Sequence, residues 1–204
     1  MSPLERLATL FEKFPGIGPR QAQRFVYHIL TQDREYTEAL TTLIRDVRTT
    51  MRECALCFRF FAVRNGESLC PTCTDTTRDA SLLIIVERDS DIAPIERSKM
   101  YHGLYFVLGG TIPLLDQHHT HKTRGPALRA IVEKKIAEGL TEVILAFSVN
   151  PDGENTARYV EAQLAPFAEK NGLTISILGR GLSTGSELEY ADPESIKNAL
   201  KNRS

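Results

Sequence analysis

Hydrophobic residues recur at helical spacing through the first fifty residues of the chain. One series is Leu4, Leu7, Leu10, Phe11 and Phe14, a second is Ala22, Phe25, Val26, Ile29 and Leu30, and a third is Leu40, Leu43, Ile44 and Val47. Apolar positions three and four residues apart are typical of amphipathic helices. The pattern therefore predicts a helical region over residues 1–52, with its third helix over 36–51.

Beyond residue 80 the pattern changes to short apolar runs that alternate with helical stretches. The runs cover 81–87, 103–110, 142–147 and 174–179, and the helical stretches cover 124–138, 154–170 and about 193–202. Apolar runs without polar alternation are typical of strands buried on both faces, as in parallel sheets. We expect an α/β fold in which helices cover both faces of a mostly parallel sheet.

Four cysteines lie between these two regions, in residues 53–78. Cys54 and Cys57 form one Cys-x-x-Cys pair, and Cys70 and Cys73 form another. Two such pairs supply four thiolates in a tetrahedral arrangement, which is the usual geometry of structural zinc. An iron site of the same four-thiolate form is chemically allowed. We predict one structural Zn²⁺ ion per chain, with no open position for catalysis.

Charge and composition limit the functional classes. The 204-residue chain is 42% hydrophobic and has a formal net charge of −1, so nucleic-acid binding would depend on local basic patches. One such patch, between residues 45 and 64, comprises Arg45, Arg48, Arg52, Arg59 and Arg64. No apolar run reaches the length of a membrane span, and the N-terminus lacks the apolar core of a secretion signal. We expect a cytoplasmic protein.

The stretch FPGIGPRQAQRF, residues 14–25, connects the first two predicted helices. Gly16 and Gly18 permit a tight turn and close approach of a ligand. Their N–H groups, with those that begin the next helix, can bind phosphate oxygens. Arg20 and Arg24 lie one helical turn apart and can contact neighbouring phosphates. The other interpretation is a tight helical connection with solvated arginines.

Glu87 directly follows the first predicted strand, where open α/β sheets place their chemistry. With the later segment AFSVNPDGENTA, it resembles the Toprim domain of topoisomerases and primases. In that resemblance Ser148 and Asn150 take the positions of two metal-binding aspartates. A magnesium site needs several carboxylate oxygens, so the resemblance implies a Toprim scaffold without catalysis. A weak magnesium site on the remaining acids stays open; these are Glu87, Asp89, Asp91, Asp152 and Glu154.

The order of these parts resembles the RecR family of bacterial recombination mediators over essentially the whole chain. The implied division is a helix-hairpin-helix region at 1–52, a zinc finger at 53–78, a Toprim-like domain at 79–178 and a C-terminal segment with a helix at 179–204. The resemblance implies a non-catalytic protein of the bacterial cytoplasm that binds DNA and forms a dimer or a ring-like tetramer. It also implies that the protein acts with RecO and RecF to load recombinase on single-stranded DNA.

Particular residues follow from the same resemblance. It implies that Arg20 and Arg24 contact DNA and that Glu87, Asp152 and Glu154 contact RecO. The chain departs from the family in the segment QHHTHKTRGP, residues 117–126, which contains His118, His119 and His121. These histidines have no cysteine or carboxylate at a familiar metal-binding spacing, so we interpret the segment as a solvated loop, in which Lys122 and Arg124 could add phosphate contacts.

Two other functional classes remain. One is a magnesium-dependent Toprim nuclease or topoisomerase-like enzyme, which the neutral Ser148 and Asn150 disfavour. The other is a zinc-stabilised interaction module that never binds DNA, which the arginines of the hairpin disfavour.

Overall fold

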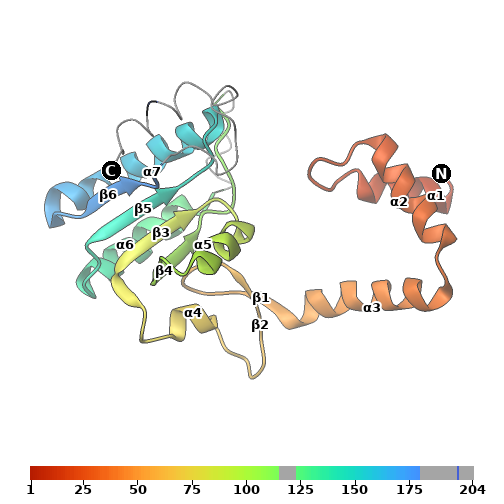
Figure 1. Cartoon of the computed structure of the whole chain (residues 1–204), viewed down its shortest axis with the longest axis horizontal. Helices are drawn as coiled ribbons and strands as arrows, with labels where there is room; N and C mark the ends of the chain where they lie inside the picture. The colour runs from red at the N-terminus through yellow and green to blue at the C-terminus, as the bar shows by residue number, and fades with distance from the viewer. Residues whose placement is uncertain (115–122, 180–196, 198–204) are drawn as a thin grey trace. The chain divides into compact units, whose positions relative to one another are not determined.

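The fold was analysed in a computed structural model, which describes residues 1–114, 123–179 and 197 (Figure 1). The chain separates into two compact units. The first comprises Met1–Met51 and Ala62–Arg64, and the second comprises Arg52–Phe61 and the chain from Asn65 onward.

The first unit contains the three predicted helices: α1 (Pro3–Phe11), α2 (Pro19–Thr31) and α3 (Arg34–Thr50). Ser2 and Glu5 form a capping box at the start of α1, which satisfies backbone donors that the helix leaves free. Helices α1 and α2 pack through a small core of Ala8, Ala22 and Val26. This packing fixes the two helices on either side of the Gly16–Gly18 turn.

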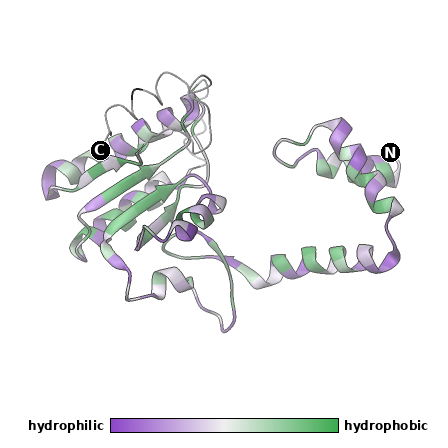
Figure 2. Ribbon diagram, viewed as in Figure 1, coloured by the Kyte–Doolittle hydropathy of each residue, from purple (hydrophilic) through white to green (hydrophobic). Residues whose placement is uncertain are grey.

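Helix α3 has its apolar positions on one face, but none of its residues is buried. The Asp33 side chain caps its first turn by accepting a hydrogen bond from the Tyr36 N–H group. Leu43, Ile44 and Val47 are 61%, 60% and 57% exposed, and Figure 2 shows the hydrophobic positions along this helix. An amphipathic helix normally buries this face, so the face has no partner among the described residues.

The cysteine segment contains little regular structure. Strands β1 (Met51–Glu53) and β2 (Phe60–Ala62) pair as a two-stranded sheet, and the short helix α4 (Pro71–Thr74) follows. We call residues 53–78 the metal module.

The second unit is built on the predicted parallel sheet. Its strands β3 (Asp79–Val86), β4 (Gly103–Val107), β5 (Glu142–Ala146) and β6 (Thr174–Ile177) lie in the order β4-β3-β5-β6 and are all parallel. Ile84 of β3 lies between Tyr105 of β4 and Ile144 of β5. The carboxyl ends of β3, β4 and β5 therefore meet at one edge of the sheet, which we call the carboxyl edge.

Helices cover both faces of this sheet, as predicted from the sequence. Helices α6 (Gly125–Ala137) and α7 (Pro151–Asn171) pack on one face, where Phe106, Leu128 and Leu164 are fully buried. A short 3-10 helix (Asp89–Asp91) and helix α5 (Ile92–Ser98) follow β3 and contribute Ile92 to the core on the other face. Helix α7 begins at Pro151, three residues before the predicted start.

Arg78 joins the end of the metal module to the sheet. Its guanidinium donates hydrogen bonds to both carboxylate oxygens of Glu96, at 2.9 and 2.8 Å, and to the Gly103 carbonyl at 2.9 Å. The hydrogen bond from Arg78 lowers the pKa of the Glu96 carboxyl, and burial raises the pKa of the neighbouring Tyr105 phenol above its usual range. This partly buried pair fixes the chain where it enters β3.

Within the described ranges, no helix is both long and apolar enough to cross a bilayer.

Candidate functional site

The Gly16–Gly18 turn leaves backbone donors exposed at the start of α2. Gly16 has a φ of +74°, a conformation that side chains rarely adopt. Gly18 is the N-cap of α2 and has an ordinary φ of −87°. Because glycine has no side chain, no side-chain hydrogen bond caps the helix. A Cβ atom built on Gly18 would meet nothing within 4 Å. Glycine is among the residues favoured at an N-cap, so this place at the start of α2 suits Gly18, and the space beside it is open.

Arg20 and Arg24 lie in the first two turns of α2 and are exposed. Neither has an ion pair with any described residue. Their spacing of four residues places them on one side of the helix. Two exposed cations thus lie in the first two turns of a helix, near the positive end of its dipole, an arrangement that suits phosphate groups.

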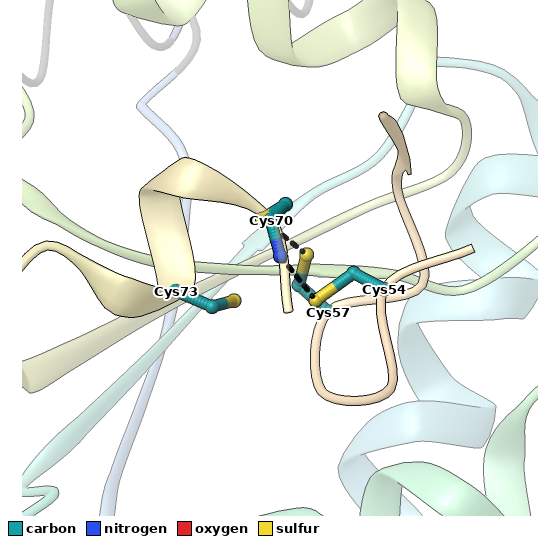
Figure 3. A group of neighbouring side chains, drawn as sticks. All are labelled: Cys54, Cys57, Cys70 and Cys73. Carbon is teal, nitrogen blue, oxygen red and sulfur yellow. Dashed lines mark hydrogen bonds between the residues drawn. The ribbon is translucent and has the colours of Figure 1, made fainter. Parts of the chain in front are cut away.

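The four cysteines come together in the second unit (Figure 3). All four Sγ atoms lie within 4.8 Å of one another, and the Sγ atoms of Cys57 and Cys70 are 3.5 Å apart. The Cys70 N–H group donates a hydrogen bond to the Cys54 Sγ atom at 3.3 Å. Cys54, Cys57 and Cys70 are buried and Cys73 is partly exposed. The predicted ligand set therefore forms one compact metal-binding cluster.

The thiols of this cluster cannot ionise independently. Hydrogen bonds with Cys57 and then with the other two cysteines hold the pKa of the Cys54 thiol far below its usual range. The hydrogen bond with Cys54 is also the main cause that raises the pKa of the Cys57 thiol. The two shifts have opposite directions because the two thiols share a hydrogen bond in which one sulfur accepts and the other donates. A divalent cation would replace these protons and hold all four sulfurs as thiolates.

Glu87 lies at the carboxyl edge, directly after β3, and is only 6% exposed. Its Oε1 atom accepts a hydrogen bond of 2.6 Å from the Ser148 N–H group, which follows β5. The carboxylate thus links the ends of two neighbouring strands.

The other two acids of the predicted set lie in the first turn of α7. Asp152 accepts a hydrogen bond of 2.9 Å from the Leu114 N–H group, and Glu154 lies 3.8 Å from Arg158, one turn later. Asn150 caps this helix, because its Oδ1 atom accepts a hydrogen bond of 2.8 Å from the Gly153 N–H group. The residue at a metal-ligand position of the Toprim pattern therefore has a helix-capping role here.

Gly153 allows α7 to begin against the end of β5. A Cβ atom at this position would lie 2.0 Å from the Ser148 carbonyl oxygen. The strand end and the helix start therefore approach so closely that any side chain at position 153 would separate them.

Two residues at this edge, Asp89 and Arg124, make contacts that the sequence did not predict. Asp89 accepts a hydrogen bond from the Phe60 N–H group of the metal module. Arg124, predicted as a residue of a solvated loop, is partly buried, and it donates hydrogen bonds to Glu53 and to the Val107 carbonyl. These three contacts join residues 17, 29 and 71 positions apart in sequence, so no local pattern could indicate them.

Two groups of predictions lie outside the described residues. The first group is His118, His119, His121 and Lys122. The second is the C-terminal helix expected near 193–202, of which the structure describes residue 197 alone.

Comparisons with known proteins agree with this arrangement. Residues 4–48 match the family model of the RecR helix-hairpin-helix, residues 81–179 match that of the Toprim domain, and residues 181–204 match that of the RecR C-terminal region.

Full-length relatives extend the match to the whole chain. The chain is 37% identical to recombination protein RecR of Cutibacterium acnes, over 98% of this chain and 94% of the relative. It is also 37% identical to the recombination proteins RecR of Chloroflexus aggregans, over 99% of this chain and 93% of the relative, and of Prochlorococcus marinus, over 95% and 96%. With its three regions matched in order and these identities over nearly its full length, the chain belongs to the RecR family.

Proposed function

We propose that this protein is a non-catalytic mediator of recombinational DNA repair in the bacterial cytoplasm. In this proposal it binds DNA and acts with RecO-like and RecF-like partners to load recombinase on single-stranded DNA. The observation that carries the proposal is the similarity to recombination proteins over nearly the whole chain. The four parts, 1–52, 53–78, 79–178 and 179–204, would then have separate tasks.

DNA binding is assigned to the hairpin residues Gly16, Gly18, Arg20 and Arg24. The exposed arginines and the free N–H groups at the start of α2 support this assignment. The open space around the Gly18 Cα atom is consistent with this assignment, because it leaves room for a ligand to approach the backbone closely. Contacts of this kind hold a phosphate backbone and do not read its base sequence.

The metal of the cysteine cluster is assigned as one structural Zn²⁺ ion per chain. Zn²⁺ with four sulfur ligands at about 2.3 Å requires sulfurs nearly 4 Å apart in a tetrahedron. The mutual distances of the four Sγ atoms, all within 4.8 Å, fit this geometry with little movement. The ion would hold together a segment with little regular structure of its own.

The carboxyl edge is assigned to partner binding through Glu87, Asp152 and Glu154, with RecO as the expected partner. Two observations support a binding role over catalysis: Ser148 and Asn150 supply no carboxylate, and the Asn150 amide oxygen caps α7. In the alternative, a magnesium-dependent nuclease or topoisomerase-like enzyme, the same three acids would be ligands of the Mg²⁺ ion.

A reconstitution experiment separates the two functions. We expect the protein, with its RecO-like and RecF-like partners, to accelerate recombinase assembly on single-stranded DNA coated by single-strand-binding protein. We expect it to leave supercoiled DNA intact in Mg²⁺. Nicking or relaxation that disappears in a Glu87→Ala variant would instead establish the enzyme.

Self-association is part of the proposal, and the apolar face of α3 supports it. Leu43, Ile44 and Val47 expose enough apolar surface on one helix to favour a protein interface. We expect Ile44→Glu to weaken self-association about tenfold or more, since burial of one such side chain contributes roughly 1.5–3 kcal/mol. Sedimentation velocity over a concentration series measures this change.

Thr49→Glu is the matched control, because Thr49 lies on the opposite side of α3 and is exposed. Its self-association should equal that of the unaltered protein. Equal weakening by both substitutions would indicate a general effect of charge and would remove α3 as the interface.

A further inference from the structure

The metal module forms part of the sheet's edge. Strand β4 is the outer strand on its side of the sheet, and the N–H group of its last residue, Val107, points away from β3. This group donates a hydrogen bond of 2.8 Å to the carbonyl of Cys57, a predicted metal ligand. The next two N–H groups, of Leu108 and Gly109, donate to Val86 and Glu87 on the other side. The backbone at Glu87 and the backbone at Cys57 are therefore held by consecutive residues of one segment.

A second connection passes through Asp89, two residues beyond Glu87. One oxygen of its carboxylate accepts the hydrogen bond from the Phe60 N–H group, and the other lies 4.0 Å from the Nε atom of Arg59. Arg59 in turn donates a hydrogen bond of 2.9 Å to the Thr72 hydroxyl, between the third and fourth cysteines. Asp89 thus contacts the segment after the first cysteine pair directly and the second pair through Arg59.

Arg124, at the start of α6, makes the third connection. Its guanidinium donates hydrogen bonds to the Val107 carbonyl at 3.0 Å and to Glu53 at 2.5 Å, and it lies over the Phe58 ring at 5.1 Å. Phe58 follows Cys57 directly, has a left-handed φ of 60°, and packs edge-on against Phe106 of the sheet core.

Gly109 leaves the space for the Arg124 guanidinium. A Cβ atom at position 109 would lie 2.8 Å from the Nη1 atom of Arg124.

These contacts shape an open, solvent-accessible cavity of about 190 Å³ at the carboxyl edge. The metal module lines one side with Phe58 and Phe60, and the strand ends and Arg124 line the other, with Glu87 among them. The cavity therefore exists only while the module and the sheet keep their present arrangement.

We propose that metal binding by the four cysteines and the geometry of the carboxyl edge around Glu87 are coupled, with Asp89 and Arg124 as the positioning residues that transmit the coupling. Coupling between two sites is reciprocal in free energy. A bound metal ion then orders the edge, and weakening of the edge loosens the metal. The inference goes beyond the proposed function and holds whether or not Glu87 contacts a partner protein.

The first test asks whether removal of the metal ion changes the carboxyl edge, and it uses the unaltered full chain. Amide hydrogen exchange is measured in Zn²⁺-loaded protein and after removal of the ion by a strong chelator. The Ser148 amide, which donates to the Glu87 carboxylate, should lose protection on chelation together with the Val107 amide, whereas Ile144, in a central strand, should keep it. Unchanged protection at Ser148 would overturn the proposal without reference to any variant.

The second test asks whether substitutions at the carboxyl edge weaken the binding of the metal ion. We expect Arg124→Lys and Asp89→Asn to release Zn²⁺ to a chromogenic chelator about tenfold faster, as for residues that support metal ligands from outside the ligand set. Arg129→Lys is the control. Arg129 is an exposed residue of α6, the helix that Arg124 precedes as its N-cap. If Arg124→Lys and Asp89→Asn both release Zn²⁺ no faster than Arg129→Lys does, the coupling is not reciprocal. The two residues are then not positioning residues.

Discussion

Replacing Cys54 by serine is expected to remove the metal ion from the protein and to unfold residues 53–78. Cys54 is fully buried, and its Sγ atom lies within 4.8 Å of the other three sulfurs. A serine hydroxyl is a poor substitute for a thiolate, and a three-sulfur site leaves one position to water. Because metal binding to small modules contributes on the order of 10 kcal/mol to folding, the loss is larger than most single substitutions cause.

Metal analysis and thermal unfolding measure this result. The unaltered protein should carry about one zinc ion per chain and the variant almost none. The melting temperature should fall by about 10 °C or more, since 1 kcal/mol corresponds to roughly 2–4 °C in a chain of this size. Ser68→Ala, an exposed substitution in the same module, should retain both the ion and the melting temperature. A Cys54→Ser variant with full zinc content would show that the cluster is not the metal site.

The elements predicted best from the sequence are those whose signal is local. The helical spacing of α1 and α2 and the apolar run of β3 depend on residues within one turn or one strand. The metal cluster is equally local, because each Cys-x-x-Cys pair brings two sulfurs together within a single turn. These features need no knowledge of the tertiary fold.

The carboxyl edge could be predicted only in part. The sequence placed Glu87 after a strand, but its hydrogen bond to Ser148 spans 61 residues. The contact of Arg124 with Glu53 spans 71 residues, and nothing near Arg124 in the sequence indicates a burial site. Contacts of this length arise from the packing of whole elements, so residues that join the module to the sheet are visible only in the folded chain.

Helix α3 shows a different limit. The apolar series was predicted correctly, but a periodic pattern says that a face is apolar and not what covers it. In the folded chain Leu43, Ile44 and Val47 stay exposed. The same hydrophobic pattern can therefore reflect either a core within one chain or an interface between chains.

Reversing the charge of both hairpin arginines, Arg20→Glu with Arg24→Glu, is expected to weaken DNA binding by about a hundredfold or more at low salt. Each charge-assisted contact is worth roughly 1.5–3 kcal/mol, and two are lost. The loss should be the same for DNA of any sequence, because phosphate contacts carry no base information. The helix itself should persist, since both side chains are exposed and neither contributes to the Ala8, Ala22 and Val26 core.

The salt dependence of binding distinguishes this contact from a general change of charge. Each phosphate contact contributes about 0.7 to the slope of log affinity against log salt for a single strand, so the variant's slope should be shallower by about 1.5. The control is Arg97→Glu with Arg129→Glu, two exposed arginines of the second unit that change the net charge equally. If the hairpin binds the DNA backbone, the control keeps nearly the original slope, because neither of its arginines belongs to the hairpin contact. If both double variants lose affinity and slope alike, the protein binds DNA through its overall field, and the hairpin is only a helical connection.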